Sequence, residues 1–142
     1  MRPKPPWHLW VTGFVSLVWN SIGALDFYMT QTRNAAYLKG FTPAQLDYFR
    51  NFPVWAVGSW GTAVSAGVLG SLLLLFRKRQ SIYAFVLSVA CMVLTDLYSF
   101  VISDGLRVMG GPAALVLSSV ILVVGVLLAA YARRMRARGV VT

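Results

Sequence analysis

Residues 53–79 read PVWAVGSWGTAVSAGVLGSLLLLFRKR, and this stretch decides the fold. The part from 53 to 76 contains no charged side chain, whereas the last three residues are Arg77, Lys78 and Arg79. An α-helix needs about 20 mainly apolar residues to cross the roughly 30 Å hydrocarbon core of a bilayer. The stretch therefore predicts a membrane-spanning helix over about 53–76 that is followed by a basic loop.

Three further segments of the chain have the same length and the same apolar character. They cover about 8–29, 82–103 and 112–132. A segment in lipid must satisfy its own backbone hydrogen bonds, and runs of this length fit helices rather than the short alternating strands of a membrane barrel. We therefore expect one all-α transmembrane domain over residues 1–142, a bundle of four helices.

The composition agrees with a lipid environment. Of the 142 residues, 58% are hydrophobic and only 12% are charged, which is too little polar surface for a soluble domain of this size. The formal charge is +9, but the basic residues lie between the long apolar runs instead of covering one face. The lipid bilayer is therefore the expected partner, and no nucleic acid is expected.

The distribution of the basic residues predicts the orientation. Nine of the 13 Lys and Arg residues lie before the first predicted span, in the 77–81 loop or after the last span. The remaining four lie in the other two loops. Because positive residues are retained in the cytoplasm, we expect both termini to be cytoplasmic in a bacterial inner membrane. Ser21-Ile22-Gly23 resembles a signal-peptide cleavage site, but its cleavage would leave three spans that fit these charges less well.

The loop after the first predicted span contains a helix signal. Thr42 is suited to an N-cap, Pro43 to the first helical position and Gln45 to the third, which together form a capping box. We expect a short amphipathic helix over about 43–51 on the outer surface. Leu46, Phe49 and Phe52 are expected to face lipid or the bundle.

The second predicted span carries small residues at every fourth position. These residues are Ser59, Ala63, Gly67 and Ser71. Rows of small residues let helix backbones approach closely, which is the main way in which helices associate in lipid. The row is explained by packing within the chain or, alternatively, by a homodimer interface.

Two predicted spans carry a polar stripe that ends in a carboxylate. Asp26 in the first span and Asp96 in the third both fall in the outer half of the membrane. A carboxylate at this depth faces the bundle interior and indicates function by default. In a shared pocket, the two carboxylates would hold one proton between them, as a proton-coupled carrier requires. The alternative is structural: Asp26 pairs with Arg33, and Asp96 accepts a hydrogen bond from Ser99, Thr95 or Asn20.

Aromatic residues near these stripes complete a candidate ligand site, because their rings can stack on a sugar or on a cation. The predicted ligand-binding residues are Asp96, Asp26, Asn20, Trp19, Ser99, Tyr98 and Trp60. The single histidine, His8, and the single cysteine, Cys91, form no metal-binding or nucleophilic pattern, and no phosphate-binding loop is present. We expect no enzyme activity, no metal and no cofactor.

Several short motifs resemble a group of small four-span proteobacterial membrane proteins. The first is Trp19-Asn20-x-x-Gly23-x-x-Asp26, followed by Met29-Thr30-x-Thr32-Arg33-Asn34. The others are Phe41-Thr42-Pro43-x-Gln45, Phe52-Pro53-x-Trp55, Gly67-Val68-Leu69-Gly70-Ser71 and Met109-Gly110-Gly111. The resemblance covers nearly the whole chain. Members of this group are largely uncharacterised, and some carry an automatic sugar-transporter label, so the resemblance implies an inner-membrane location without a mechanism.

Two functional hypotheses follow from the sequence. The first is a small-solute or proton-linked carrier, which would act as a dimer because four helices are too few to enclose an alternating-access path. The second is a non-catalytic accessory subunit that packs against a larger membrane complex. The smooth aliphatic surface of the last predicted span suits either lipid or a partner helix.

Overall fold

The computed structural model describes residues 3–142, and every regular element in that range is helical. The four long elements are α1 (Trp7–Gln31), α3 (Val54–Leu75), α4 (Gln80–Leu97) and α6 (Pro112–Ala137). The short elements are the 3₁₀ turn η1 (Tyr37–Gly40), α2 (Pro43–Arg50), the π-helical turn η2 (Tyr98–Ile102) and α5 (Gly105–Val108). The all-α prediction is thus confirmed for the described residues. Arg2, which contributes to the predicted charge distribution, lies outside them.

Three helical segments of the described chain are long and apolar enough to cross a membrane. They are Val54–Leu75, Gln80–Ile102 and Pro112–Ala137, and they match three of the predicted spans. The fourth prediction, 8–29, coincides with the 25-residue helix α1. This helix is long enough but carries more polar residues, among them Ser16, Asn20 and Asp26. A fourth crossing therefore stays a prediction.

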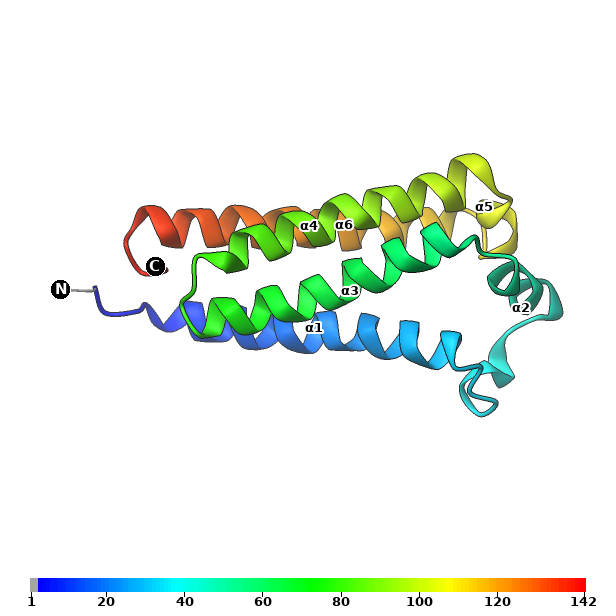
Figure 1. The fold of residues 1–142 in the computed structure, drawn as a ribbon, viewed down its shortest axis with the longest axis horizontal. Coiled ribbons are helices and arrows are strands. Elements are labelled where there is room, and N and C mark those ends of the chain that lie inside the picture. The colour runs from blue at the N-terminus through cyan, green and yellow to red at the C-terminus, as the bar shows by residue number, and fades with distance from the viewer. Residues whose placement is uncertain (1–2) are drawn as a thin grey trace.

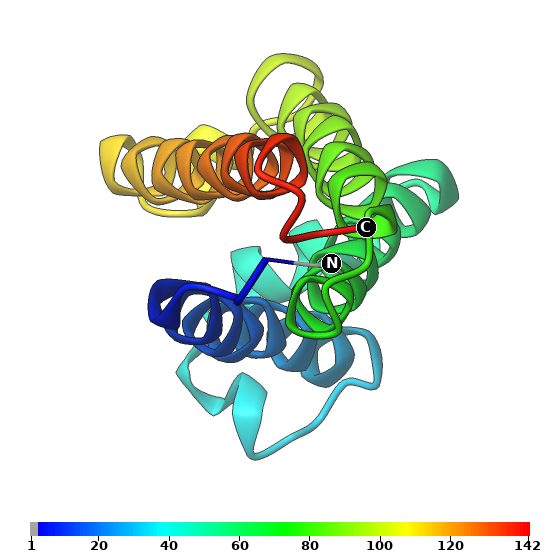
Figure 2. The same ribbon diagram turned by 90° about the vertical axis from the view of Figure 1, so that its left-hand side faces the viewer.

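The long helices form a row in the order α1, α3, α4, α6, which curves so that α1 and α6 face one another (Figures 1 and 2). α3 lies between α1 and α4, and α6 packs on α4. Glycines bring these helices close together. A Cβ atom built on Gly70 of α3 would lie 2.9 Å from the Phe85 ring of α4, and one built on Gly125 of α6 would lie 2.8 Å from Val89.

The small residues that suggested a dimer make contacts inside the chain. Ser59 Oγ donates to the carbonyl of Cys91 in α4 at 2.7 Å, and Ser88 Oγ of α4 donates to the carbonyl of Ala63 at 2.7 Å. Gly67 and Ser71 contact Asn20 of α1. A homodimer through this row stays a prediction, and the row's contacts described above lie within the chain.

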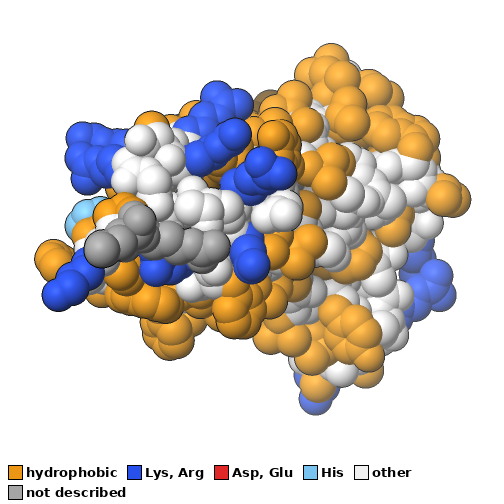
Figure 3. Space-filling model, turned by 60° about the vertical axis from the view of Figure 1, so that its left-hand side comes forward, with side chains coloured by type: hydrophobic (Ala, Val, Ile, Leu, Met, Phe, Trp, Pro, Cys, Tyr) orange, Lys and Arg blue, Asp and Glu red, His pale blue; other side chains and the backbone are white. Residues whose placement is uncertain are grey.

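The end of the bundle that holds both chain tails and the 76–79 turn is called the tail end. Its core consists of Leu9, Leu74, Ile82, Phe85, Leu128, Ala129, Ala132, Met135, Val140 and Val141. Arg77 ties the two tails together, because Nε donates to the carbonyl of Val140 at 2.9 Å and Nη2 donates to that of Pro3 at 3.2 Å. Lys and Arg side chains surround this end, whereas hydrophobic side chains cover the flanks (Figure 3). The tail end is therefore closed and basic.

The opposite end, called the loop end, carries η1, α2 and α5 (Figure 1). The predicted capping box of α2 is present, with Thr42 and Gln45 bonded in both directions. α2 and the residues that follow it dock through aromatic contacts rather than facing lipid alone. Phe49 of α2 stacks on Trp60 at a centroid distance of 5.8 Å, and Phe52, after α2, meets Tyr98 at 4.9 Å. This docking places α2 over the ends of α3 and α4.

Candidate functional site

A partly open cavity of about 470 Å³ lies among the four long helices. Its polar and aromatic lining consists of Trp19, Asn20, Asp26, Tyr37, Trp60, Phe85 and Ser88, and the other lining residues are mainly aliphatic. α1 supplies three of these seven side chains, α4 supplies two, and η1 and α3 supply one each. The arrangement resembles a small-molecule site, which is typically an apolar pocket with a few placed polar groups.

The cavity has a closed floor and a mouth between two helices. Phe85 and Leu128, which belong to the core of the tail end, line it from below. Ile22 of α1 and Leu117 of α6 also line it, although their side chains are 62% and 58% exposed. The opening therefore lies on the side where α1 faces α6.

Asn20 is held in place on the wall of the cavity. Its Nδ2 donates to the carbonyl of Ser16 at 2.8 Å and to Oγ of Ser71 at 3.3 Å. A Cβ atom on Gly67 would lie only 2.1 Å from Oδ1 of Asn20, so a glycine is needed opposite this side chain. Because both hydrogen bonds use Nδ2, the hydrogen bonds of residues 3–142 leave Oδ1 available as an acceptor.

Asp26 lies at the loop end of the cavity and contacts Tyr37. The hydroxyl of Tyr37 donates to Oδ1 of Asp26 and thereby ties η1 to α1. This hydrogen bond, together with burial and the charge of Asp26, raises the pKa of Tyr37 to about 12. The predicted structural partner of Asp26 was Arg33, which lines a different pocket. The partner seen in the structure is Tyr37.

Asp96 does not line the cavity. Its Oδ2 accepts a hydrogen bond from Oγ of Ser118 at 2.5 Å, which links α4 to α6. The predicted structural donors were Ser99, Thr95 and Asn20. Thr95 instead donates to the carbonyl of Cys91 at 3.0 Å, and Asn20 faces α3. The two carboxylates therefore do not share the cavity, and the pair that a proton-coupled carrier would use is not assembled there.

The structure divides the seven predicted site residues into two groups. Trp19, Asn20, Asp26 and Trp60 line the cavity. Tyr98 instead packs edge-on against Phe52 and Trp55 in the aromatic cluster of the loop end. Ser99 lies in η2, where its carbonyl accepts a hydrogen bond from Oγ of Ser103 at 3.2 Å. Together with Asp96, these two residues lie outside the cavity.

Comparisons with protein-family models, with curated proteins and with solved structures find no match for this chain. The kind of ligand that fits the cavity is therefore inferred from the side chains that line it.

Two polar lining residues, Tyr37 and Ser88, are not among the seven predicted site residues. Tyr37 begins η1, a 3₁₀ turn too short for helical periodicity to indicate which way a side chain points. The only sequence signal is an aromatic residue 11 positions after Asp26. Within residues 3–142, no three His, Cys, Asp or Glu side chains are grouped as a metal site would need. Asp26 is the single carboxylate among the lining residues.

Proposed function

We propose that this chain is a four-span inner-membrane protein with cytoplasmic termini that binds a small amphipathic solute in the cavity, as the loading site of a carrier. Three apolar helices and the length of α1 support the membrane placement. The nine basic residues that flank the predicted cytoplasmic ends support the orientation. The observation that carries the proposal is the cavity lined by all four long helices.

The lining indicates the chemistry of the solute. Two acceptors among the lining side chains make no hydrogen bond within residues 3–142, namely Oδ1 of Asn20 and the second carboxylate oxygen of Asp26. The indole N–H groups of Trp19 and Trp60 are donors without a partner there. Trp19 and Trp60 add aromatic faces that attract a cation or the apolar face of a sugar. The expected ligand therefore has an apolar body and a head group rich in hydrogen-bond donors, such as an amine or a sugar hydroxyl group.

The carrier role places a second requirement on the molecule. The core of the tail end closes the cavity on its cytoplasmic side in the proposed orientation, so transport requires that core to open. Because four helices are too few to enclose a complete path, we propose that the carrier acts as a dimer. The dimer would use lipid-facing surfaces of α1 or α6, since the small residues of α3 are occupied within the chain.

Binding to the purified protein tests this proposal. Hexylamine and octyl glucoside serve as amine and sugar probes, and tryptophan fluorescence reports occupancy beside Trp19 and Trp60. We expect Asp26→Asn to weaken binding of the amine by about tenfold, because a charged hydrogen bond contributes roughly 1.5–3 kcal/mol. Asp104→Asn is the matched control, because Asp104 is an exposed carboxylate outside the cavity. Equal binding of both probes to wild type and Asp26→Asn, or no saturable binding at all, would contradict the proposal.

One observation favours the alternative of an accessory subunit. α6 exposes a continuous aliphatic face made of Val116, Leu117, Val120, Val123, Val126 and Leu127. This face suits a partner helix as well as lipid. Purification in mild detergent separates the two functions: a larger complex that contains this chain supports the subunit. A chain that purifies alone as a monomer or homodimer argues against it.

A further inference from the structure

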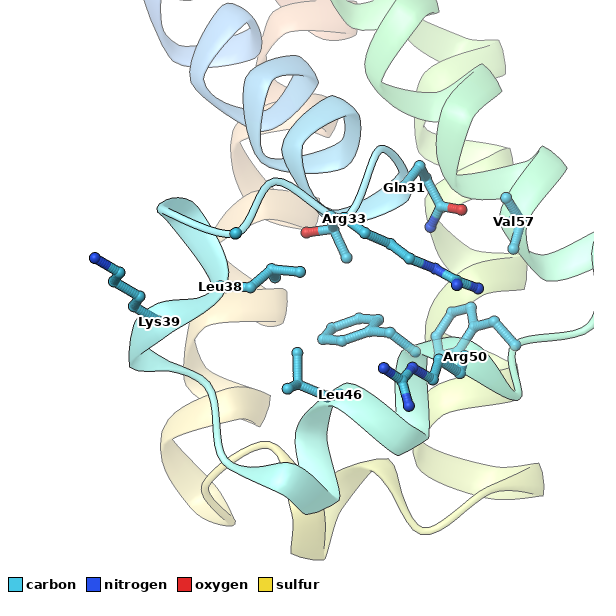
Figure 4. Close-up of a pocket in the computed structure, with 11 residues that line it drawn as sticks. Gln31, Arg33, Leu38, Lys39, Leu46, Arg50 and Val57 are labelled. Atoms are coloured by element: carbon cyan, nitrogen blue, oxygen red, sulfur yellow. The ribbon is translucent and has the colours of Figure 1, made fainter.

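A second pocket, of about 400 Å³, lies at the loop end and shares no lining residue with the cavity. It lies between the end of α1, η1, α2 and the start of α3 (Figure 4). Leu38, Leu46, Phe49, Phe52 and Val57 form its apolar walls. The pocket therefore has apolar walls and polar residues from the loop that follows α1.

All charged residues that line this pocket are positive. Arg33, Lys39 and Arg50 are among its lining residues, and no Asp or Glu is. In Figure 4 the side chain of Arg33 extends along the upper side of the pocket and that of Arg50 lies below it, Gln31 lies next to Arg33, and Lys39 points away. Two guanidinium groups that line one pocket whose lining has no carboxylate form a site for an anion.

A buried hydroxyl in the same lining points to a missing acceptor. Thr30 is 6% exposed, and its Oγ1 has no hydrogen-bond partner among the described residues. A buried polar group without a partner is destabilising, so the acceptor oxygen of a ligand would relieve this defect. The other buried oxygen without a partner in the described chain, Oγ of Ser81, belongs to the α4 start at the tail end.

The backbone at Arg33 adds to this picture. Arg33 follows the end of α1 with φ 54°, in the left-handed region where Gly or Asn is usual. The chain places a long cationic side chain there even though the conformation disfavours it. Arg77, the other non-Gly residue of the described chain with positive φ, uses its side chain to hold the two chain tails, so this conformation also occurs at a purely structural position.

We propose that this pocket binds a phosphate group through Arg33 and Arg50. A phosphate monoester carries a charge between about −1.5 and −2 at neutral pH and offers three acceptor oxygens, which two guanidinium groups and the amide of Gln31 match. A single carboxylate would leave part of the basic charge uncompensated. The phosphate comes from one of two sources, a lipid head group at the membrane interface or a soluble phosphate compound, and the chemistry of recognition is the same.

The test uses the full chain in a maltoside detergent, which contains no phosphate. Inorganic phosphate is titrated by calorimetry in one arm, and dioleoyl phosphatidic acid, whose head group is a phosphate monoester, is titrated in mixed micelles in the other. The variants are Arg50→Gln, on the exposed side of α2, and Arg33→Asn, which keeps a residue that tolerates the left-handed conformation. The matched control is Arg107→Gln, which removes an exposed positive charge at the loop end outside the pocket.

We expect each pocket variant to weaken binding about tenfold or more, and Arg107→Gln to change it less than about twofold. If only the lipid binds saturably, the ligand of the pocket is a lipid head group. If inorganic phosphate binds saturably and the lipid displaces it, both sources share one phosphate site. The absence of saturable binding in both arms overturns the proposal. It is also overturned if Arg107→Gln weakens binding as much as Arg50→Gln, because the effect would then be one of overall charge.

Discussion

The two ends of the bundle differ in how their side chains are used. At the tail end, Leu9, Leu74 and Met135 are at most 1% exposed, and the two chain tails are hydrogen-bonded through Arg77. At the loop end, no residue of η1 or α2 is buried, and the structure leaves two pockets in or beside this half. The tail end is thus the closed part of the described chain, whereas the proposed binding sites lie between the long helices and at the loop end.

This difference shows how a small chain can keep a stable core at one end and a cavity beside it. A cavity costs free energy because its walls lose packing contacts, and the cost rises with its volume. The closed core at one end offsets that cost without occupying the volume that a ligand needs. His8 Nδ1 and Tyr131 OH, hydrogen-bonded at 2.5 Å, also link α1 and α6 near the tail end, so the helices remain joined where the cavity ends.

The largest expected effect is the loss of packing at the tail end. Leu74 is fully buried there, so Leu74→Ala is expected to lower the free energy of unfolding by about 2–5 kcal/mol. Leu106→Ala in α5 is the matched control, because Leu106 is 38% exposed at the loop end and should cost less than about 1 kcal/mol. Unfolding in mixed micelles by added dodecyl sulfate measures both variants. Equal losses would mean that stability is not concentrated at the tail end.

An intermediate effect is expected on the wall between the two ends. Gly67→Ala forces Asn20 away from its hydrogen bonds, and we expect a loss of about 1–3 kcal/mol together with weaker solute binding. Gly58→Ala in the same helix is the control, because no heavy atom lies within 4 Å of its added Cβ. Alanine favours a helix over glycine by up to about 1 kcal/mol, so this variant should be neutral or stabilising. The same unfolding assay applies, and equal results for both variants would contradict the placement of Asn20.

The smallest effect on stability concerns Tyr37 at the loop end. Its pKa is raised above the usual value of about 10 to about 12, so its contribution is complete below about pH 10 and is lost as the pH rises through about 12. Phenolate absorbance of wild type minus that of Tyr37→Phe should therefore show a component with a midpoint near pH 12. Asp26→Asn removes the charge and is expected to move that midpoint to lower pH. A midpoint near pH 10 in this difference would exclude the contact with Asp26.

Much of the fold follows from local sequence signals. All four apolar runs are helical in the structure, three of them apolar enough to cross a membrane, and the Thr42 to Gln45 capping box starts α2 as expected. These features depend on composition and on contacts within one turn, which neighbouring residues determine. The membrane crossing by α1 stays a prediction, because Ser16, Asn20 and Asp26 interrupt its apolar character.

The candidate site could be predicted only in part, because it depends on which helices are neighbours. Helical periodicity placed Asn20 and Asp26 on an inward stripe, and both line the cavity. It could not show that Asp96 meets Ser118 of α6, since that pair is 22 residues apart and forms only when α4 packs on α6. The same limit applies to Tyr37, whose position is set by a loop, and to Val140 and Val141, which pack into the core after α6 has ended.

The mouth bordered by Ile22 and Leu117 has a further consequence in the proposed membrane setting. A mouth between two lipid-facing helices is reached by lateral diffusion, so its occupancy follows the solute concentration among the acyl chains rather than that in water. Each methylene favours partitioning by about 0.8 kcal/mol, and four methylenes therefore enrich a solute about 200-fold. Preference for longer homologues can thus arise from the partition coefficient alone, without any additional contact with the protein.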